Sequence, residues 1–341
     1  MEITVKTTRR TLLAGSAALA GTLALPAIAR AAGAEFVYKF GVDLPPSHPT
    51  SIWAQKAADR IAAETNGRME LQIFPNSQLG SSTDMNSQIR SGALEFLSQS
   101  GPVLSQVVPA ASINSVGFAF SSEDEVWKAL DGELGGYIRG QIEKAGLVAM
   151  DKIWSLGFRQ ITSSSTPVKG PGDLKGMKIR VPPGTIFISL FKALAASPTS
   201  INYNELYTAL QTHIVDAQEN PVGVLVAAKL YEVQKYLSIT NHMWAGYWFL
   251  ANRAAFEALP PDIQATVTRI VNECGVEQRA QLAREDGAYL KELGDKGLLI
   301  NETKPDDFRT ALIEAGYYKE AASRFGEKPW ALLEKYTGKL G

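Results

Sequence analysis

Residues 36–74 read FVYKFGVDLPPSHPTSIWAQKAADRIAAETNGRMELQIF, and this stretch decides the fold class. Apolar residues alternate from Phe36 to Val42, which predicts a half-buried strand. A proline-rich loop and a helical apolar stripe follow, and Asn66-Gly67 ends the helix as a left-handed cap. Alternation resumes at Met69–Ile73 as a second strand. A strand, a helix and a strand in this order predict an α/β fold with parallel strand pairs.

The rest of the chain continues this pattern and suggests two lobes. The polar run 162–167 resembles a linker where the chain crosses between lobes, and residues 177–181 form another predicted strand. From Pro261 to Leu293 the apolar spacing is helical throughout, which predicts a helix of roughly 50 Å that braces both lobes. The single cysteine, Cys274, lies on its apolar face, so we expect a buried structural thiol and no internal disulfide.

The N-terminus has the form of an export signal. Arg9-Arg10 precede an apolar run that ends in the small-residue pattern Ala29-Arg30-Ala31, so residues 1–31 are expected to be a cleaved signal peptide. The paired arginines favour the twin-arginine route, and a Sec signal remains the alternative. The mature protein is then expected to be soluble, in the periplasm.

Composition and motifs argue against several function classes. The formal net charge is −1, so nothing favours a nucleic-acid partner. The sequence lacks a nucleophile elbow, a zinc-protease motif, a P-loop and a dinucleotide fingerprint, so we expect no enzyme and no cofactor. The scattered histidines His48, His213 and His242 are predicted to be turn or surface residues, without a metal site.

Arg180 is the strongest candidate for ligand binding. It lies opposite the apolar face of the predicted strand 177–181, which stops at once in a Pro-Gly turn. Ligands of open α/β sheets bind at the carboxyl ends of strands. A guanidinium there can hold a carboxylate with two parallel hydrogen bonds, which lysine cannot do. The alternative from spacing alone is a surface ion pair.

Two other polar residues stand at similar places. Arg159 lies at the proposed crossing between lobes, where a cleft would open, and an interlobe salt bridge is an equal alternative for it. Asn220 ends a predicted strand just before a proline. It could fix a ligand oxygen, although an isolated asparagine there is more often a turn residue.

Several ordered motifs resemble one known family, the extracytoplasmic solute receptors of TRAP transporters of the DctP type. The resemblance covers nearly all of the chain after the signal. The matching stretches are Asn66-Gly67, Gln78-Leu79-Gly80, Ser91-Gly92-Ala93-Leu94-Glu95, Gly157-Phe158-Arg159, Leu174-Lys175-Gly176-Met177-Lys178-Ile179-Arg180-Val181-Pro182, Tyr207-Thr208-Ala209-Leu210-Gln211 and Val215-Asp216-Ala217-Gln218-Glu219-Asn220-Pro221.

This resemblance implies roles for individual residues. Arg180 would clamp the carboxylate of a bound acid, Arg159 would join it, and Asn220 would complete the anion cradle. Tyr203, at the start of a short helix, would pack on the ligand.

The resemblance is looser at the positions that set selectivity. His48, Ser82, Ser100 and Trp154 match positions that contact the distal part of ligands in relatives. They are small or aromatic here rather than acidic, which favours a smaller or partly apolar acid over a highly hydroxylated sugar acid. His213 stands where the family usually has glycine or asparagine, in a left-handed position.

The resemblance also implies an architecture and a role. We expect a two-lobed periplasmic binding protein of type II, each lobe a mixed sheet flanked by helices. Lobe I would take residues 32–158 and 246–285, and lobe II residues 159–245 and 286–341. A monomer would capture a small organic-acid anion by hinge closure and deliver it to the TRAP membrane subunits.

Two other functions are open from the sequence. A receptor for an ATP-driven importer shares the two-lobed logic but lacks the order of motifs quoted above. An exported enzyme is possible because twin-arginine signals often accompany cofactor proteins that fold before export. The missing catalytic motifs argue against that reading.

Overall fold

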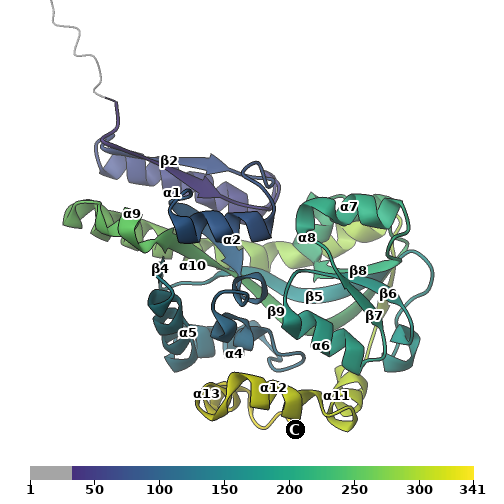
Figure 1. Cartoon of the computed structure of the whole chain (residues 1–341). Coiled ribbons are helices and arrows are strands. Elements are labelled where there is room, and N and C mark those ends of the chain that lie inside the picture. The colour runs from purple at the N-terminus through teal and green to yellow at the C-terminus, as the bar shows by residue number, and fades with distance from the viewer. Residues whose placement is uncertain (1–32) are drawn as a thin grey trace, which may run out of the picture. The chain divides into compact units, whose positions relative to one another are not determined.

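The computed structural model describes residues 33–341, in which ten strands join into one mixed sheet flanked by helices (Figure 1). The signal peptide predicted for residues 1–31 lies outside the described residues. The strands are β1 (Phe36–Gly41), β2 (Met69–Phe74), β3 (Phe96–Ser100), β4 (Leu147–Ala149), β5 (Trp154–Ser163), β6 (Lys178–Val181), β7 (Ser197–Ser200), β8 (Ala217–Pro221), β9 (Tyr236–Asn252) and β10 (Leu299–Glu302). The order across the sheet is β2-β1-β3-β9-β5-β8-β6-β7, and β4 and β10 pair with β9.

The helices lie between these strands in the chain and after β10. They are α1 (Pro49–Glu64), α2 (Ser82–Ser91), α3 (Gly101–Leu104), α4 (Glu123–Leu130), α5 (Glu133–Lys144), α6 (Thr185–Ala193), α7 (Tyr203–Gln211), α8 (Val222–Ala227), α9 (Arg253–Glu257), α10 (Pro261–Asp295), α11 (Pro305–Glu314), α12 (Tyr317–Phe325) and α13 (Glu327–Thr337). Short 3-10 helices cover Pro109–Ser115, Pro171–Leu174 and Leu230–Glu232. Within residues 33–341, none of these helices has the length and apolar character of a membrane span.

The first strand, helix and strand form as predicted. β1 and β2 pair in parallel, with Phe36 opposite Met69, and α1 covers them with a buried stripe that includes Trp53 and Ile61. After α1, Asn66 and Gly67 adopt φ of 54° and 76°, the left-handed turn that frees the chain to return as β2.

Two long strands connect the two ends of the sheet. β5 and β9 are antiparallel neighbours in its middle, so β1 to β3 lie on one side of this pair and β6 to β8 on the other. The predicted fold class, a mixed α/β sheet with flanking helices, is confirmed. The sheets expected for two lobes are joined by hydrogen bonds through this central pair, and the predicted lobe boundaries stay predictions.

Helix α10 spans the region beside this central pair. It contains 35 residues in one piece and packs on α1, on β5 and on α8, as Figure 1 shows. The prediction of one long helix is therefore confirmed. Cys274 is completely buried in it, among the apolar residues that face β1, α1 and β9, which confirms the expected buried thiol.

Some local predictions are wrong. Thr162 and Ser163 are not part of a linker, because β5 continues through them and both are buried. His48 and His242 are not surface residues, since the side chains of both are almost fully buried. His213 is exposed and has a φ of 56°, as the left-handed position required.

Candidate anion-binding site

Three neighbouring strands bring the predicted polar residues together. β8 lies between β5 and β6, antiparallel to the first and parallel to the second. In this register Arg159 of β5 pairs with Pro221, next to Asn220, and Arg180 of β6 pairs with Gln218. The two arginines and the asparagine therefore meet by strand pairing, although they lie far apart in the sequence.

Arg159 is held in an ion pair inside the protein. Its side chain pairs with the fully buried carboxylate of Glu219 through Nε. Nη2 donates to Glu219 Oε1 at 2.9 Å, to the Glu219 carbonyl oxygen at 2.7 Å and to Asn220 Oδ1 at 3.0 Å. The carboxylate of Glu219 thus balances the charge of Arg159, and the hydrogen bonds of Nε and Nη2 fix its guanidinium in place.

Glu219 also binds a buried histidine. His242 Nε2 lies 3.1 Å from Glu219 Oε2, and its Nδ1 lies 2.8 Å from Thr240 Oγ1. Burial raises the pKa of Glu219, but the charge of Arg159 and the hydrogen bonds from His242 and Arg159 outweigh it and keep that pKa below its ordinary value. Burial lowers the pKa of His242, so the imidazole is neutral near pH 7. The single anion Glu219 is therefore shared by one cation and one neutral donor.

Arg180 has a different environment. Arg180 is only 1% exposed, and its Nε donates to the Ile201 carbonyl oxygen at 2.8 Å. Nη1 is buried without a hydrogen-bond partner in the described part of the chain. No Asp or Glu of residues 33–341 forms a salt bridge with it. Burial lowers the pKa of Arg180 to about 10, so the side chain still carries its charge at neutral pH.

An acidic residue that the sequence analysis missed lies near these arginines. Asp43 follows β1 and is buried. Its carboxylate accepts from the Ser82 hydroxyl at 2.6 Å and from the Tyr247 hydroxyl at 3.0 Å. Burial raises the pKa of Asp43 above its ordinary value, and these hydrogen bonds and the charge of Arg180 offset that rise only in part. The only signal in the sequence was its position directly after a strand.

These groups line one small cavity of about 30 Å³. Six of the predicted residues are in its wall, together with Asp43, Tyr247 and an apolar group that the sequence did not single out. The predicted residues are Arg180, Arg159, Asn220, Tyr203, Ser100 and Ser82, and the apolar ones include Leu44, Val103, Leu156, Pro182 and Phe187. The hydroxyl of Tyr203 is buried without a partner within residues 33–341. The cavity thus has a cationic end, free hydrogen-bonding groups and apolar walls.

Trp154 and His48 are not in the wall of this cavity. Trp154 packs in the core with its ring centroid 5.6 Å from that of Phe249. His48 begins α1, and its Nδ1 accepts from the Thr50 backbone N–H at 3.1 Å. Burial lowers the pKa of His48 to about 3, so it is a neutral cap.

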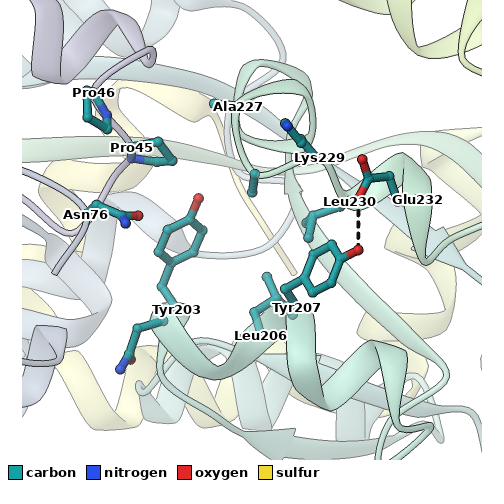
Figure 2. Close-up of a pocket in the computed structure, with 12 residues that line it drawn as sticks. Pro45, Pro46, Asn76, Tyr203, Leu206, Tyr207, Ala227, Lys229, Leu230 and Glu232 are labelled. Atoms are coloured by element: carbon teal, nitrogen blue, oxygen red, sulfur yellow. Dashed lines mark hydrogen bonds between the residues drawn. The ribbon is translucent and has the colours of Figure 1, made fainter.

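A wider and more open groove lies beside the cavity (Figure 2). Pro45, Pro46 and Asn76 line one part of it, and residues of α7 and of the segment 227–232 line another. Tyr207 donates to Glu232 across 2.8 Å in its wall. Its lysine, Lys229, is exposed to solvent, and an exposed ammonium attracts an anion only weakly. The arginine cavity is therefore the better candidate, although it is smaller.

Among the described residues, no three His, Cys, Asp or Glu side chains gather as potential metal ligands. The arrangement instead offers hydrogen-bond donors to an anion in a site closed to water, where such bonds are strong.

Comparisons with known proteins agree with this chemistry. The sequence profile of the bacterial extracellular solute-binding proteins, family 7, known as DctP, matches residues 40–322. The 2,3-diketo-L-gulonate-binding periplasmic protein YiaO of Escherichia coli is 32% identical over 262 residues, which cover 77% of this chain and 80% of that protein. The C4-dicarboxylate-binding periplasmic protein DctP of Rhodobacter capsulatus is 28% identical over 338 residues, covering 97% and 99%.

Solved structures are similar over most of the described chain. A TRAP periplasmic solute binding protein from Sulfurospirillum deleyianum with bound succinate has a TM-score of 0.84 and 28% identity, covering 89% of this chain and 99% of that one. A sugar acid binding protein from Advenella mimigardefordensis in complex with galactonate has a TM-score of 0.85 and 26% identity, covering 89% and 98%. Because the profile spans most of the sequence, the chain belongs to family 7 of the bacterial extracellular solute-binding proteins, the DctP family.

Proposed function

We propose that this protein is a periplasmic receptor that captures a small organic acid in the arginine cavity and delivers it to the membrane subunits of a TRAP transporter. The observation that carries the proposal is Arg180, a charged guanidinium that is 1% exposed and lacks a carboxylate partner in residues 33–341. Burying an unpaired charge costs several kcal/mol. A ligand carboxylate would supply the missing counter-ion, and its binding would recover that energy.

The neighbours of Arg180 would then orient the ligand. Arg159 and Asn220 are fixed by their own hydrogen bonds, so they offer donors without a further loss of side-chain entropy. Tyr203 brings an unpaired hydroxyl. Leu156 and Phe187 would pack on the carbon skeleton. The apolar side chains beside the arginines favour a small or partly apolar acid.

Relatives support this class of ligand. The solved structures similar to this chain hold succinate, galactonate and D-erythronate, which are all carboxylates. In our proposal the acid binds between lobe I, residues 32–158 and 246–285, and lobe II, residues 159–245 and 286–341. Contacts with both lobes would favour the closed form that the membrane subunits recognise. Residues 1–31 would direct export and then be cleaved, and the protein would act as a monomer without enzymatic activity.

The test is the affinity of an Arg180→Ala variant. A ligand is first found with a thermal-shift screen of organic acids, because a ligand that binds only the folded state raises the melting temperature. Calorimetry should then show a loss of about 2–5 kcal/mol for Arg180→Ala, or roughly 30-fold to several thousand-fold. Arg180→Lys should recover little, because an ammonium cannot bind both carboxylate oxygens in parallel.

A control variant separates this role from a general effect of charge. Arg269→Ala removes an exposed arginine that pairs with Glu64 and Glu273 on the surface, and its affinity should match that of the wild type. An unchanged affinity of Arg180→Ala would show that the acid binds elsewhere. A purified sample with an absorbing cofactor would favour an exported enzyme instead.

A further inference from the structure

The cavity wall contains a buried carboxyl group as well as a buried guanidinium. Asp43 and Arg180 both line the cavity, but they do not form a salt bridge with each other. Asp43 forms no salt bridge with any other basic residue of 33–341 either. The carboxylate of Asp43 is held by the hydroxyls of Ser82 and Tyr247. These donors are neutral, and the charge of Arg180 offsets the cost of burying this carboxyl group only in part.

Asp43 can accept further hydrogen bonds. A carboxylate has about four acceptor positions on its two oxygens, and the hydroxyl donors Ser82 and Tyr247 use two of them. Tyr203 lines the same space with a hydroxyl that has no partner in the described residues. A ligand that reaches this part of the cavity therefore meets an anionic acceptor, where the sequence had suggested small or aromatic groups and no acid.

We propose that Asp43 makes the cavity selective for acids with one carboxylate and a hydrogen-bond donor, either a hydroxyl or an ammonium group, and that it disfavours dicarboxylates. This inference rests on the proposed function, in which Arg180 holds the first carboxylate. A donor group on the ligand would satisfy the free acceptor positions of Asp43. A second carboxylate would face the carboxyl group of Asp43 in a largely buried site, which is unfavourable when both groups carry their charge.

The experiment compares acids of equal length. At each length from three to six carbons, the panel holds the unsubstituted acid, the acids with a hydroxyl or an amino group at the second or the last carbon, and the dicarboxylate. Calorimetry on the wild type should show that the best hydroxy or amino acid binds at least about tenfold more tightly than the dicarboxylate of that length, a difference of about 1.4 kcal/mol.

Asp43→Asn then tests the source of the selectivity. Asparagine keeps the shape and one acceptor oxygen but removes the charge, so the ratio between the donor-bearing acid and the dicarboxylate should fall to about threefold or less. The variant also separates the two ligand chemistries. An ammonium ligand should lose at least about tenfold in affinity, whereas a hydroxyl ligand should lose much less because the amide oxygen still accepts. Asp59→Asn, the same substitution at an exposed aspartate of α1 outside the cavity wall, should keep the wild-type ratio.

The outcomes distinguish this inference from the proposed function. If the dicarboxylate binds the wild type as tightly as the donor-bearing acids, the inference is overturned without any variant. An unchanged ratio in a folded Asp43→Asn variant, checked by its melting temperature, overturns it as well. In both cases a loss of binding in Arg180→Ala would leave the proposed function standing. If no acid of the panel binds, both proposals fail.

Discussion

The strands β5 and β6 each carry one buried arginine, and the surroundings of the two arginines differ. Arg159 on β5 is paired with Glu219, and that carboxylate also contacts His242. Arg180 on β6 has one hydrogen bond, to the Ile201 carbonyl oxygen, and a terminal nitrogen without a partner in the described chain. The two residues have the same chemistry and nearly the same burial, so the protein partners alone separate them.

This difference assigns the two arginines different roles. A buried cation with an internal counter-ion mainly maintains structure, because its energy is already balanced in the free protein. The burial cost of Arg180 is offset only in part by the charge of Glu219, so an anion from outside can still lower the energy of this cation. Arg159 on β5 therefore has a structural role, whereas Arg180 on β6 is the residue that binds the ligand. Each prediction below tests one part of this comparison.

The largest expected effect concerns the counter-ion of Arg159. Glu219→Gln keeps the size of the side chain but removes its charge, which leaves Arg159 buried without compensation. We expect the free energy of unfolding to fall by about 3–5 kcal/mol, measured by urea denaturation of the ligand-free protein. Glu273→Gln is the control, because that exposed carboxylate pairs with Arg60 and Arg269 at the surface. Its denaturation midpoint should change little. A similarly small loss in Glu219→Gln would contradict the structural role assigned to Arg159.

The two arginines should respond with opposite sign to the same substitution. Arg180→Met removes an unpaired charge, and this gain should outweigh the lost hydrogen bond to Ile201. The free energy of unfolding without ligand should then stay equal or rise by about 1–2 kcal/mol. Arg159→Met should lower it, because Glu219 becomes the unpaired ion. Equal losses in both variants would mean that Arg180 is compensated in the free protein.

The smallest expected effect on the free energy of unfolding concerns a buried carboxyl group outside the cavity wall, which lacks a hydrogen-bond partner on one oxygen. Asp286 of α10 has a buried carboxylate oxygen without a partner in residues 33–341. Burial, with the charges of Glu123 and Glu285, raises its pKa to about 6. This pKa lies above that of Asp286 in the unfolded chain. The protonated carboxyl group therefore contributes stability that is fully present below about pH 4 and is lost as the pH rises through about 6.

Asp286→Asn should remove this pH dependence. Relative to the wild type, the variant should gain about 1 kcal/mol between pH 4 and pH 7, a value reduced for the partial exposure of the side chain. Thermal unfolding at several pH values measures it. Ligand affinity should not change, in contrast to substitutions of Arg180. A gain that is the same at pH 4 and pH 7 would show that the carboxylate does not titrate in this range.

Much of the fold was predictable because its signals are local. Alternation predicted β1 and β2, and the Asn66-Gly67 pair predicted the end of α1. The apolar spacing predicted α10 nearly to its end. The run 162–167 was predicted to be a linker, although β5 continues through Thr162 and Ser163. Strand boundaries depend on which residues find a partner in the sheet, and a single segment does not carry that information.

The candidate site was predictable only in part. Arg180, Arg159, Asn220 and Tyr203 were found from strand ends and ordered motifs, and all four line one cavity. Asp43 was missed because an aspartate before a proline-rich loop has the composition of an ordinary turn. The burial of His48 and His242 was missed for a related reason, since a single histidine does not show whether neighbouring elements will cover it.

By itself the sequence determined the family, the first strand, helix and strand, the long helix α10 and the strand that carries Arg180, because periodicity, caps and motifs are properties of contiguous residues. The tertiary structure alone decided that Glu219 neutralises Arg159 while Arg180 stays unpaired, and that Asp43 joins them in the cavity. The physical reason is that burial and charge compensation depend on distances between segments that only the pairing of β5, β8 and β6 brings together.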